Sequence, residues 1–177
     1  TCGGGVHWRE LNSHTTSKHS CSTAPTAVLG CKLYLLTGEQ EYLDWAIKCY
    51  DYMLNVLQDK SDHLFYDNVR PGKDDPNQPG DIEKNKYSYN SGQPLQAACL
   101  LYKITGEQKY LDEAYAIAES CHKKWFIPYR SKELNLTFNI FAPKQDMWFN
   151  TIMCRGFFEL YSIDNNRKYV DDIEKSM

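Results

Sequence analysis

The feature that most constrains the fold is an internal repeat. The twelve residues Leu33–Asp44 (LYLLTGEQEYLD) return as Leu101–Asp112 (LYKITGEQKYLD), 68 residues further along the chain. A degraded third copy covers 160–171, 59 residues after the second. The first two copies carry a central glycine, where a left-handed backbone can end one helix and lead into the next. Each copy is therefore predicted to be a helix, a tight turn and a second helix, with Asn165 or Asn166 replacing the glycine in the third.

Apolar residues spaced three and four apart flank each turn and predict the extent of the helices. The expected hairpins pair 25–36 with 41–57, 97–104 with 111–121, and 147–161 with 169–173. Ser22 or Thr23 is expected to cap the first helix, with Pro25 in its first turn. The stretches 1–21, 59–90 and 126–145 are rich in Gly, Pro, Asn and Asp and are expected to be irregular.

The spacing of the hairpins favours a ring over a stacked array. Solenoid repeats are about 20–45 residues long with short loops, whereas here the excess length lies in the connections. Such a pattern is typical of an all-α (α/α) toroid, the (α/α)6-barrel type, which sends its long connections to one face. A closed ring needs about six hairpins and this chain holds three. Residues 1–177 are therefore expected to form the C-terminal half of such a domain, without its N-terminal half.

Charge and cysteine content exclude several classes of protein. The chain has 20 basic and 23 acidic residues and a pI near 5.9, which argues against a nucleic-acid binder held by phosphate contacts. No apolar run approaches the roughly 18 residues of a membrane span. No spacing of His, Cys or Asp predicts a metal site, and no cofactor motif is present. Five cysteines lie in apolar helical stretches as small hydrophobes, while a bridge between Cys2 and Cys21 stays open.

Three loop segments carry candidate functional residues. In the first segment, TCGGGVHW at 1–8, the glycines would let the backbone approach a ligand and Trp8 would form a stacking wall. In the second, KYSYNSGQ at 86–93, Tyr87 and Tyr89 would point to one side of an extended chain, beside a helix capped by Asn90 or Ser91. The third, QDMWFN, precedes the last hairpin. A flexible loop, and two core tyrosines beside a helix cap, are the plain structural alternatives.

Taken in order, these segments resemble glycoside hydrolase family 76, the endo-α-1,6-mannanases. The matching motifs are a Cys-Gly-Gly-Gly-x-x-Trp segment, two Leu-Tyr-x-x-Thr-Gly hairpins, a Tyr-x-Tyr-Asn-x-Gly segment and an Arg-x-hydrophobic-x-x-Leu-Tyr helix. They correspond to Cys2–Trp8, Leu33–Asp44, Tyr87–Gly92, Leu101–Asp112 and Arg155–Tyr161. The resemblance covers essentially the whole chain, and the glycine motif combined with the tyrosine-asparagine motif points to this family.

The resemblance implies hydrolysis of α-1,6-mannosidic linkages with retention, by a pair of aspartates about 5 Å apart. In the family this pair precedes the glycine motif, so it is expected upstream of Thr1 and no catalytic residue is assigned to this chain. The fragment alone is accordingly expected to be inactive. Two Asp doublets do occur, Asp74–Asp75 in a polar loop and Asp171–Asp172 on what looks like a solvated helical face. Neither occupies the family's catalytic position.

The resemblance also implies a substrate cleft that binds mannan or a manno-oligosaccharide. The cleft-lining candidates are Gly3, Gly4, Gly5, Trp8, Asp67, Tyr87, Tyr89, Asn90 and Trp148. Asp67 is the candidate carboxylate for mannose hydroxyls, although an Asp in a turn is an equally ordinary role. Trp148 would either stack on a sugar or fill the core. His7 stands where the family more usually has an aromatic residue.

Other functions remain compatible with the same helical ring. One is another (α/α)6 sugar enzyme, an unsaturated glucuronyl hydrolase or an N-acylhexosamine epimerase; the epimerases use histidines, whereas His14, His19, His63 and His122 lie in polar loops or at helix ends. A second is a non-catalytic glycan-binding protein of the same fold, and a third is a helical interaction scaffold. The full-length protein is expected to be secreted, periplasmic or at the cell surface. Half a ring should also expose an apolar face that pairs with the missing half or with a second copy.

Overall fold

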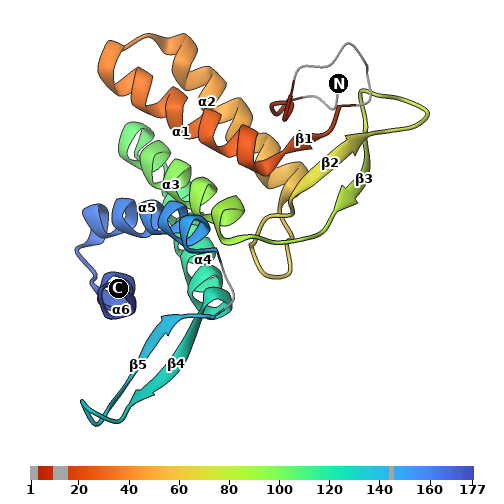
Figure 1. Cartoon of the computed structure of the whole chain (residues 1–177). Coiled ribbons are helices and arrows are strands. Elements are labelled where there is room, and N and C mark those ends of the chain that lie inside the picture. The colour runs from red at the N-terminus through yellow and green to blue at the C-terminus, as the bar shows by residue number, and fades with distance from the viewer. Residues whose placement is uncertain (1–3, 10–15, 144–145) are drawn as a thin grey trace.

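The structure, a computed structural model, describes residues 4–9, 16–143 and 146–177 and consists mainly of three helical hairpins (Figure 1). The helices are α1 (Ser20–Thr37), α2 (Gln40–Tyr52), α3 (Ser88–Thr105), α4 (Gln108–Trp125), α5 (Met147–Asp164) and α6 (Lys168–Ser176). A wider π-helical turn, η1 (Met53–Leu57), continues α2. The predicted helical class and the pairing of the helices are confirmed.

The three turns are built alike, as the repeat predicted. Gly38, Gly106 and Asn165 adopt φ angles of 75°, 71° and 55°. In each turn the backbone N–H of this residue donates to the carbonyl of a tyrosine four residues earlier, over 2.8 Å. Of the two asparagines considered for the third turn, the structure selects Asn165. The left-handed residue thus satisfies a carbonyl that the end of the helix would leave unpaired.

Helix α3 is the centre of the structure and packs against α1, α4 and α5. Its crossing with α5 is close because both helices present a glycine there. A Cβ atom added to Gly92 would overlap the backbone of Met153, and one added to Gly156 would lie 2.6 Å from the Gly92 carbonyl oxygen. The buried cysteines at 31, 49, 99, 121 and 154 are free thiols within this packing, as predicted. Cys21 is also free, and Cys2 lies outside the described residues.

Two helices begin earlier than expected, because their polar residues bond to distant segments. Helix α1 begins at Ser20, so Ser22 and Thr23 lie inside it. The Ser22 hydroxyl donates to the Val6 carbonyl, and the Thr23 hydroxyl accepts from the Val6 N–H, both over 2.9 Å. These bonds hold the glycine segment on α1. A tertiary partner has replaced the local cap that the sequence suggested.

The same correction applies to α3, which begins at Ser88 with Tyr87 preceding it. Asn90 and Ser91 are buried within its first turns and do not cap it. The Ser91 hydroxyl accepts a hydrogen bond of 3.1 Å from the N–H of Phe65. Ser88 donates to Asn150 Oδ1 over 2.9 Å, which joins the starts of α3 and α5.

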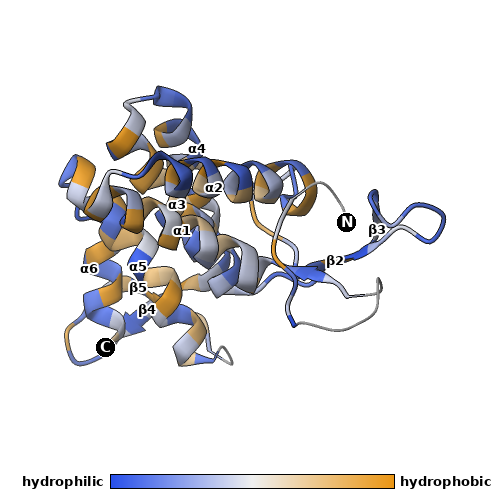
Figure 2. Ribbon diagram, turned by 90° about the horizontal axis from the view of Figure 1, so that it is seen from above, coloured by the Kyte–Doolittle hydropathy of each residue, from blue (hydrophilic) through white to orange (hydrophobic). Residues whose placement is uncertain are grey.

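The long connections contain strands where irregular chain was expected. Strands β1 (Lys18–His19), β2 (Asn68–Pro71) and β3 (Pro79–Glu83) form one antiparallel sheet, and β4 (Phe126–Ser131) pairs with β5 (Leu136–Phe141) as a hairpin. Both features project from the helices (Figure 1). In Figure 2 the tip beyond β2 and β3 is hydrophilic, whereas apolar residues concentrate on the helices. Strands with so little buried surface leave a weak hydrophobic signal in the sequence.

Two of the long connections meet at the starts of α1 and α3. Ser20 at the start of α1 donates its N–H to the Asp67 carbonyl over 2.9 Å. The bonds from Phe65 to α3 and from α3 to α5 extend this line of contacts. Within the described residues no helix is both long and apolar enough to cross a bilayer.

Candidate functional site

Asp67 lies at the centre of the candidate site, between η1 and β2. Its N–H donates to the Glu83 carbonyl over 3.0 Å, and its own carbonyl accepts from Ser20. The Ser20 hydroxyl also donates to the carbonyl of Tyr66 over 2.5 Å. The backbone that carries Asp67 is therefore held by both α1 and β3.

The Asp67 carboxylate gathers polar groups from three segments of the chain. Its Oδ1 accepts from Asn90 Nδ2 over 3.0 Å and from the Tyr89 hydroxyl over 3.4 Å. Its Oδ2 accepts from Asn68 Nδ2 over 3.0 Å and lies 3.9 Å from His19 Nδ1. The Asp67 side chain is 18% exposed. The structure thus brings together three of the residues singled out in the sequence, Asp67, Tyr89 and Asn90, and adds His19 and Asn68.

Four aromatic side chains form a group on one side of Asp67, at the starts of α3 and α5. Tyr89 stacks on Tyr87, with ring centroids 5.6 Å apart, and on Trp148, at 5.7 Å. Phe149 packs edge-on against all three rings. Tyr87 precedes α3 and Tyr89 lies within it, so the expected extended segment is wrong although the two rings are parallel to within 2°.

Trp148 is an exposed member of this aromatic group. Its side chain is 59% exposed, which excludes the alternative that it fills the core. Phe149, which the sequence analysis did not select, packs edge-on against Trp148, with ring centroids 4.3 Å apart. Burial is the main cause of a raised pKa of the Tyr89 hydroxyl, and the negative charge of Asp67 adds to it. Tyr89 therefore keeps its proton and can donate a hydrogen bond.

Trp8 lies on the other side of Asp67. It is 58% exposed and stacks on His19, with ring centroids 5.5 Å apart. The Arg9 guanidinium lies 5.6 Å from the centre of the Trp8 ring. A pocket of about 330 Å³ opens here, lined by Trp8, Arg9, Thr16, Ser17, His19, Asn68 and Arg70.

His19 was not selected from the sequence, where it was assigned to polar loops and helix ends. It is the last residue of β1 and directly precedes α1. Its Nε2 lies 2.8 Å from the Ser17 hydroxyl. Burial lowers the pKa of His19, and the nearby Asp67 opposes this only in part. The imidazole is therefore neutral at neutral pH, and its ring stacks on Trp8.

The glycine segment packs against Tyr52, which gives a structural reason for its composition. Gly5 has a φ of +71°, and a Cβ there would lie 2.5 Å from the Tyr52 ring. A Cβ on Gly4 would lie 3.1 Å from the same ring. Lys18 is buried, donates to the Gly4 carbonyl and lies over Tyr52. The close approach that the glycines permit is thus to Tyr52; Gly3 lies outside the described residues.

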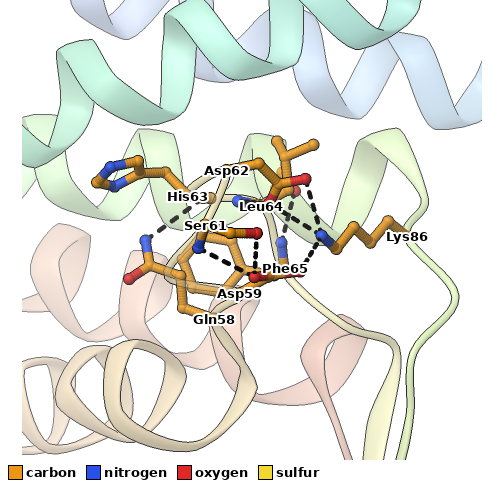
Figure 3. A network of polar contacts seen from close by, with 9 residues as sticks. Gln58, Asp59, Ser61, Asp62, His63, Leu64, Phe65 and Lys86 are labelled. Atoms are coloured by element: carbon orange, nitrogen blue, oxygen red, sulfur yellow. Dashed lines mark hydrogen bonds and ion pairs between the residues drawn. The ribbon is translucent and has the colours of Figure 1, made fainter.

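Figure 3 shows a polar network around Lys86, the residue before Tyr87 in the chain. Lys86 Nζ donates to Asp59 Oδ2 over 2.6 Å and to both oxygens of Asp62 over 2.8 and 2.9 Å. The Lys86 side chain is only 12% exposed and its ammonium lies over the Tyr66 ring. Burial disfavours its charge, but the two aspartates outweigh this and raise the pKa of Lys86. The hydrogen bond from Lys86 is the main cause of a lowered pKa of Asp59. Because Lys86 directly precedes Tyr87, the network fixes the chain that enters the aromatic group.

The two aspartate doublets lie away from these residues. Asp74 and Asp75 are exposed in the turn between β2 and β3. Asp171 pairs with Arg167 on α6. Asp172 is buried, against expectation, and its Oδ2 bonds to His122 over 2.7 Å and to Asn139 over 2.9 Å. Its partners come from α4 and β5, so it joins α6 to the rest of the fold.

Comparison with known proteins assigns the chain to a family. The model of glycosyl hydrolase family 76 matches residues 1–177. A glycoside hydrolase family 76 mannosidase from Bacteroides thetaiotaomicron is 90% identical, with a TM-score of 0.95 over 99% of this chain and 46% of that one. The match confirms the (α/α)6-barrel type, of which the described helices are a part.

Two more distant relatives carry names that describe a substrate. The mannan endo-1,6-alpha-mannosidase DCW1 of Candida albicans is 32% identical over 68% of this chain and 26% of its own length. An inactive variant of the α-1,6-mannanase of Salegentibacter, with two adjacent aspartates changed to alanine, has been solved in complex with α-1,6-mannotetrose. It is 26% identical, with a TM-score of 0.73 over 92% of this chain and 45% of that one. The chain thus spans less than half the length of these relatives.

Proposed function

The chain belongs to glycosyl hydrolase family 76, and from that membership we propose that it supplies the sugar-binding part of an enzyme that hydrolyses α-1,6-linked mannan. The observation that carries the proposal is the Asp67 carboxylate set near the aromatic group that includes Trp148 and near the exposed Trp8. Carboxylates accept strong hydrogen bonds from sugar hydroxyls, and flat rings cover the apolar faces of a sugar. The names of the relatives supply the substrate class.

Each part of the site has a distinct task in this proposal. Asp67 accepts hydrogen bonds from two hydroxyls of one mannose unit, while Tyr89 and Asn90 hold the carboxylate in place. Trp148 and Trp8, both more than half exposed, cover sugar units on either side. Gly4 and Gly5 keep the loop that carries Trp8 in register over Tyr52. Tyr87 extends the aromatic surface beside Tyr89.

The hydrolysis itself is assigned to carboxylates outside residues 1–177. A retaining glycosidase needs a nucleophile and an acid/base group about 5 Å apart, facing the scissile bond. This chain has two aspartate doublets. Asp74 and Asp75 are exposed in a turn. In the other doublet, Asp171 pairs with Arg167 and Asp172 with His122. We therefore place the reaction in the full-length protein. Since a mannan polymer cannot cross a membrane, we also place it at the cell surface or outside the cell.

The test compares binding and hydrolysis of α-1,6-mannotetrose by the full-length protein. Replacing Asp67 with Asn removes the charge and keeps the shape. We expect affinity, measured by titration calorimetry, to fall about 10- to 100-fold, since hydrogen bonds to a charged group contribute about 1.5–3 kcal/mol. Asp74→Asn, which changes an exposed aspartate in the β2–β3 turn, is the matched control and should leave affinity unchanged.

Three results would separate the possible functions. Equal affinity in wild type and Asp67→Asn would contradict the role of Asp67. Binding without any release of shorter oligosaccharides would indicate a non-catalytic glycan-binding protein. Lack of binding to α-1,6-mannotetrose would contradict the mannanase proposal itself. It would favour the alternative that the protein is another sugar enzyme of the same fold.

A further inference from the structure

The pocket beside Trp8 contains two guanidinium groups that the sugar-binding role does not use. Arg9 and Arg70 both line it and both are exposed. No carboxylate in the described part of the chain forms a hydrogen bond or ion pair with either of them. Of the described acidic groups around the pocket, Asp67 accepts from Asn68 and Asn90, and Asp81, which lines a neighbouring hollow with Arg70, lies 4.0 Å from Lys73.

The rest of the pocket lining is neutral and able to donate hydrogen bonds. Asn68 stands between the pocket and Asp67, because it lines the one and donates to the other. Ser17 and His19, which are bonded to each other, complete this wall. On its other side Arg70 also lines a second hollow of about 590 Å³, together with Ser17 and Lys73. The pocket thus carries two positive charges. Neutral side chains, among them Asn68, lie between these charges and the Asp67 carboxylate.

We propose that this pocket binds an anionic group, a phosphate, carried by the glycan next to the sugar unit held at Asp67. The planar guanidinium presents paired N–H donors that match phosphate oxygens, and two of them line one pocket. This inference rests on the proposed function, which it extends to phosphorylated α-1,6-mannan as a substrate class.

The exposure of the two arginines favours a phosphate attached to the glycan over a free phosphate ion. Exposed ion pairs contribute little in water, too little to hold a free ion at physiological concentration. A phosphate tethered to a sugar chain that is already bound meets the same groups at a high effective concentration. The adjoining Trp8 and Asp67 provide that anchoring.

The experiment measures the affinity of the full-length protein, by titration calorimetry at low salt, for three ligands. These are α-1,6-mannotetrose, the same oligosaccharide carrying one phosphate group, and inorganic phosphate. We expect the phosphorylated oligosaccharide to bind about five- to tenfold more tightly than the neutral one, and the preference to vanish at high salt. Arg70→Gln should reduce the preference, and the double variant with Arg9→Gln should abolish it. Arg130→Gln is the matched control, because the partners of Arg130 among the described residues are Asn135 and Thr137 on the β4–β5 hairpin.

The outcomes separate this inference from the proposed function. Equal affinity for the neutral and phosphorylated oligosaccharides, or a preference that survives the double variant, would overturn the inference and leave the mannanase proposal intact. Inorganic phosphate that binds as tightly as the phosphorylated oligosaccharide would also overturn it, in favour of a free-anion site. Binding of the phosphorylated ligand alone would overturn the inference in its present form, because the phosphate would then be held without the anchoring at Trp8 and Asp67. Failure of both oligosaccharides to bind would overturn both proposals.

Discussion

At the scale of single residues, the site is a set of polar side chains held by partners from distant parts of the chain. Asp67 illustrates this, because its carboxylate is approached from β1, β2 and α3. Its neighbours are fixed in turn, Trp8 by His19 and Tyr87 by Lys86, which directly precedes it. Such support holds a binding surface in one geometry before the ligand arrives, which lowers the entropic cost of binding.

His19 should make the protein less stable in mild acid. Its pKa in the folded protein is below the ordinary value of 6.5, so the folded state binds fewer protons than the unfolded state between these two pKa values. The stabilisation is complete above pH 6.5 and is lost as the pH falls through the folded-state pKa. We expect the melting temperature of wild type to fall more steeply below this pH than that of His19→Gln. Identical slopes in the two proteins would contradict this, since every other histidine is common to both.

Lys86 should contribute to both stability and affinity. Lys86→Met leaves Asp59 and Asp62 without their shared cation, and we expect a loss of about 2 kcal/mol in the free energy of unfolding, measured with urea. The loosened chain before Tyr87 should also weaken oligosaccharide binding. Lys84→Met is the control, because Lys84 is exposed two residues earlier and forms no ion pair with the described residues. Equal unfolding curves for the two variants would exclude a structural role of the Lys86 network.

At the scale of helices and strands, the structure depends on how closely its elements approach. The α3–α5 crossing is the closest of these contacts, because Gly92 and Gly156 remove side chains from it. This crossing also sets the distance between Tyr89 at the start of α3 and Trp148 at the start of α5. Packing in the core therefore directly affects the relative position of Tyr89 and Trp148 on the binding surface.

Gly92→Ala should separate these two helices. The added methyl group would meet the backbone of Met153, which cannot move aside as a flexible side chain can. We expect a loss of about 1–3 kcal/mol in the free energy of unfolding from overpacking, together with weaker stacking of Tyr89 on Trp148, visible in the fluorescence of Trp148. Gly38→Ala tests a different requirement, since a Cβ there meets open space and costs only backbone strain. A Gly92→Ala protein as stable as wild type would contradict the close crossing.

The helices were predictable from the sequence and much of their surroundings was not. The ends of α1, α3 and α5 follow from local chemistry, a glycine or asparagine with positive φ, and this is visible in three copies of one motif. Their starts depend on bonds such as Ser22 to Val6 and Ser91 to Phe65, which no local pattern reveals. Strands β4 and β5 escaped prediction because most of their side chains are exposed or half-buried.

In the candidate site, too, some residues were predicted from the sequence and others were not. Asp67, Tyr89 and Asn90 lie in motifs that resemble a known family, and the structure places them in contact. His19 and Phe149 were missed, although Phe149 directly follows Trp148. The position of His19 is set by pairing of β1 with β2, in which it lies opposite Asn68. Non-local strand pairing of two residues leaves no readable periodicity.

At the scale of the whole molecule, the helical surface carries apolar side chains that the described residues leave exposed. They are Leu29, Leu35 and Leu36 on α1, Trp45 on α2 and Phe158 on α5, each about half exposed or more. The ammonium of Lys48 lies over the Trp45 ring, which is nevertheless 51% exposed. A ring of hairpins would bury such side chains between neighbouring hairpins.

Residues 1–177 produced alone should therefore associate with themselves. Large exposed apolar groups favour association because burying them releases water, with about 25 cal/mol gained per Å² of apolar surface. We expect sedimentation velocity to show species larger than 20.6 kDa, with the proportion rising with concentration. The variant Leu36→Lys with Trp45→Lys places two charges on this surface and should shift the distribution toward the monomer. A concentration-independent monomer in the unmodified chain would mean that the exposed groups are tolerated in water. In that case the half-ring interpretation would lose its main physical consequence, and these three hairpins would have to be regarded as a domain able to stand alone.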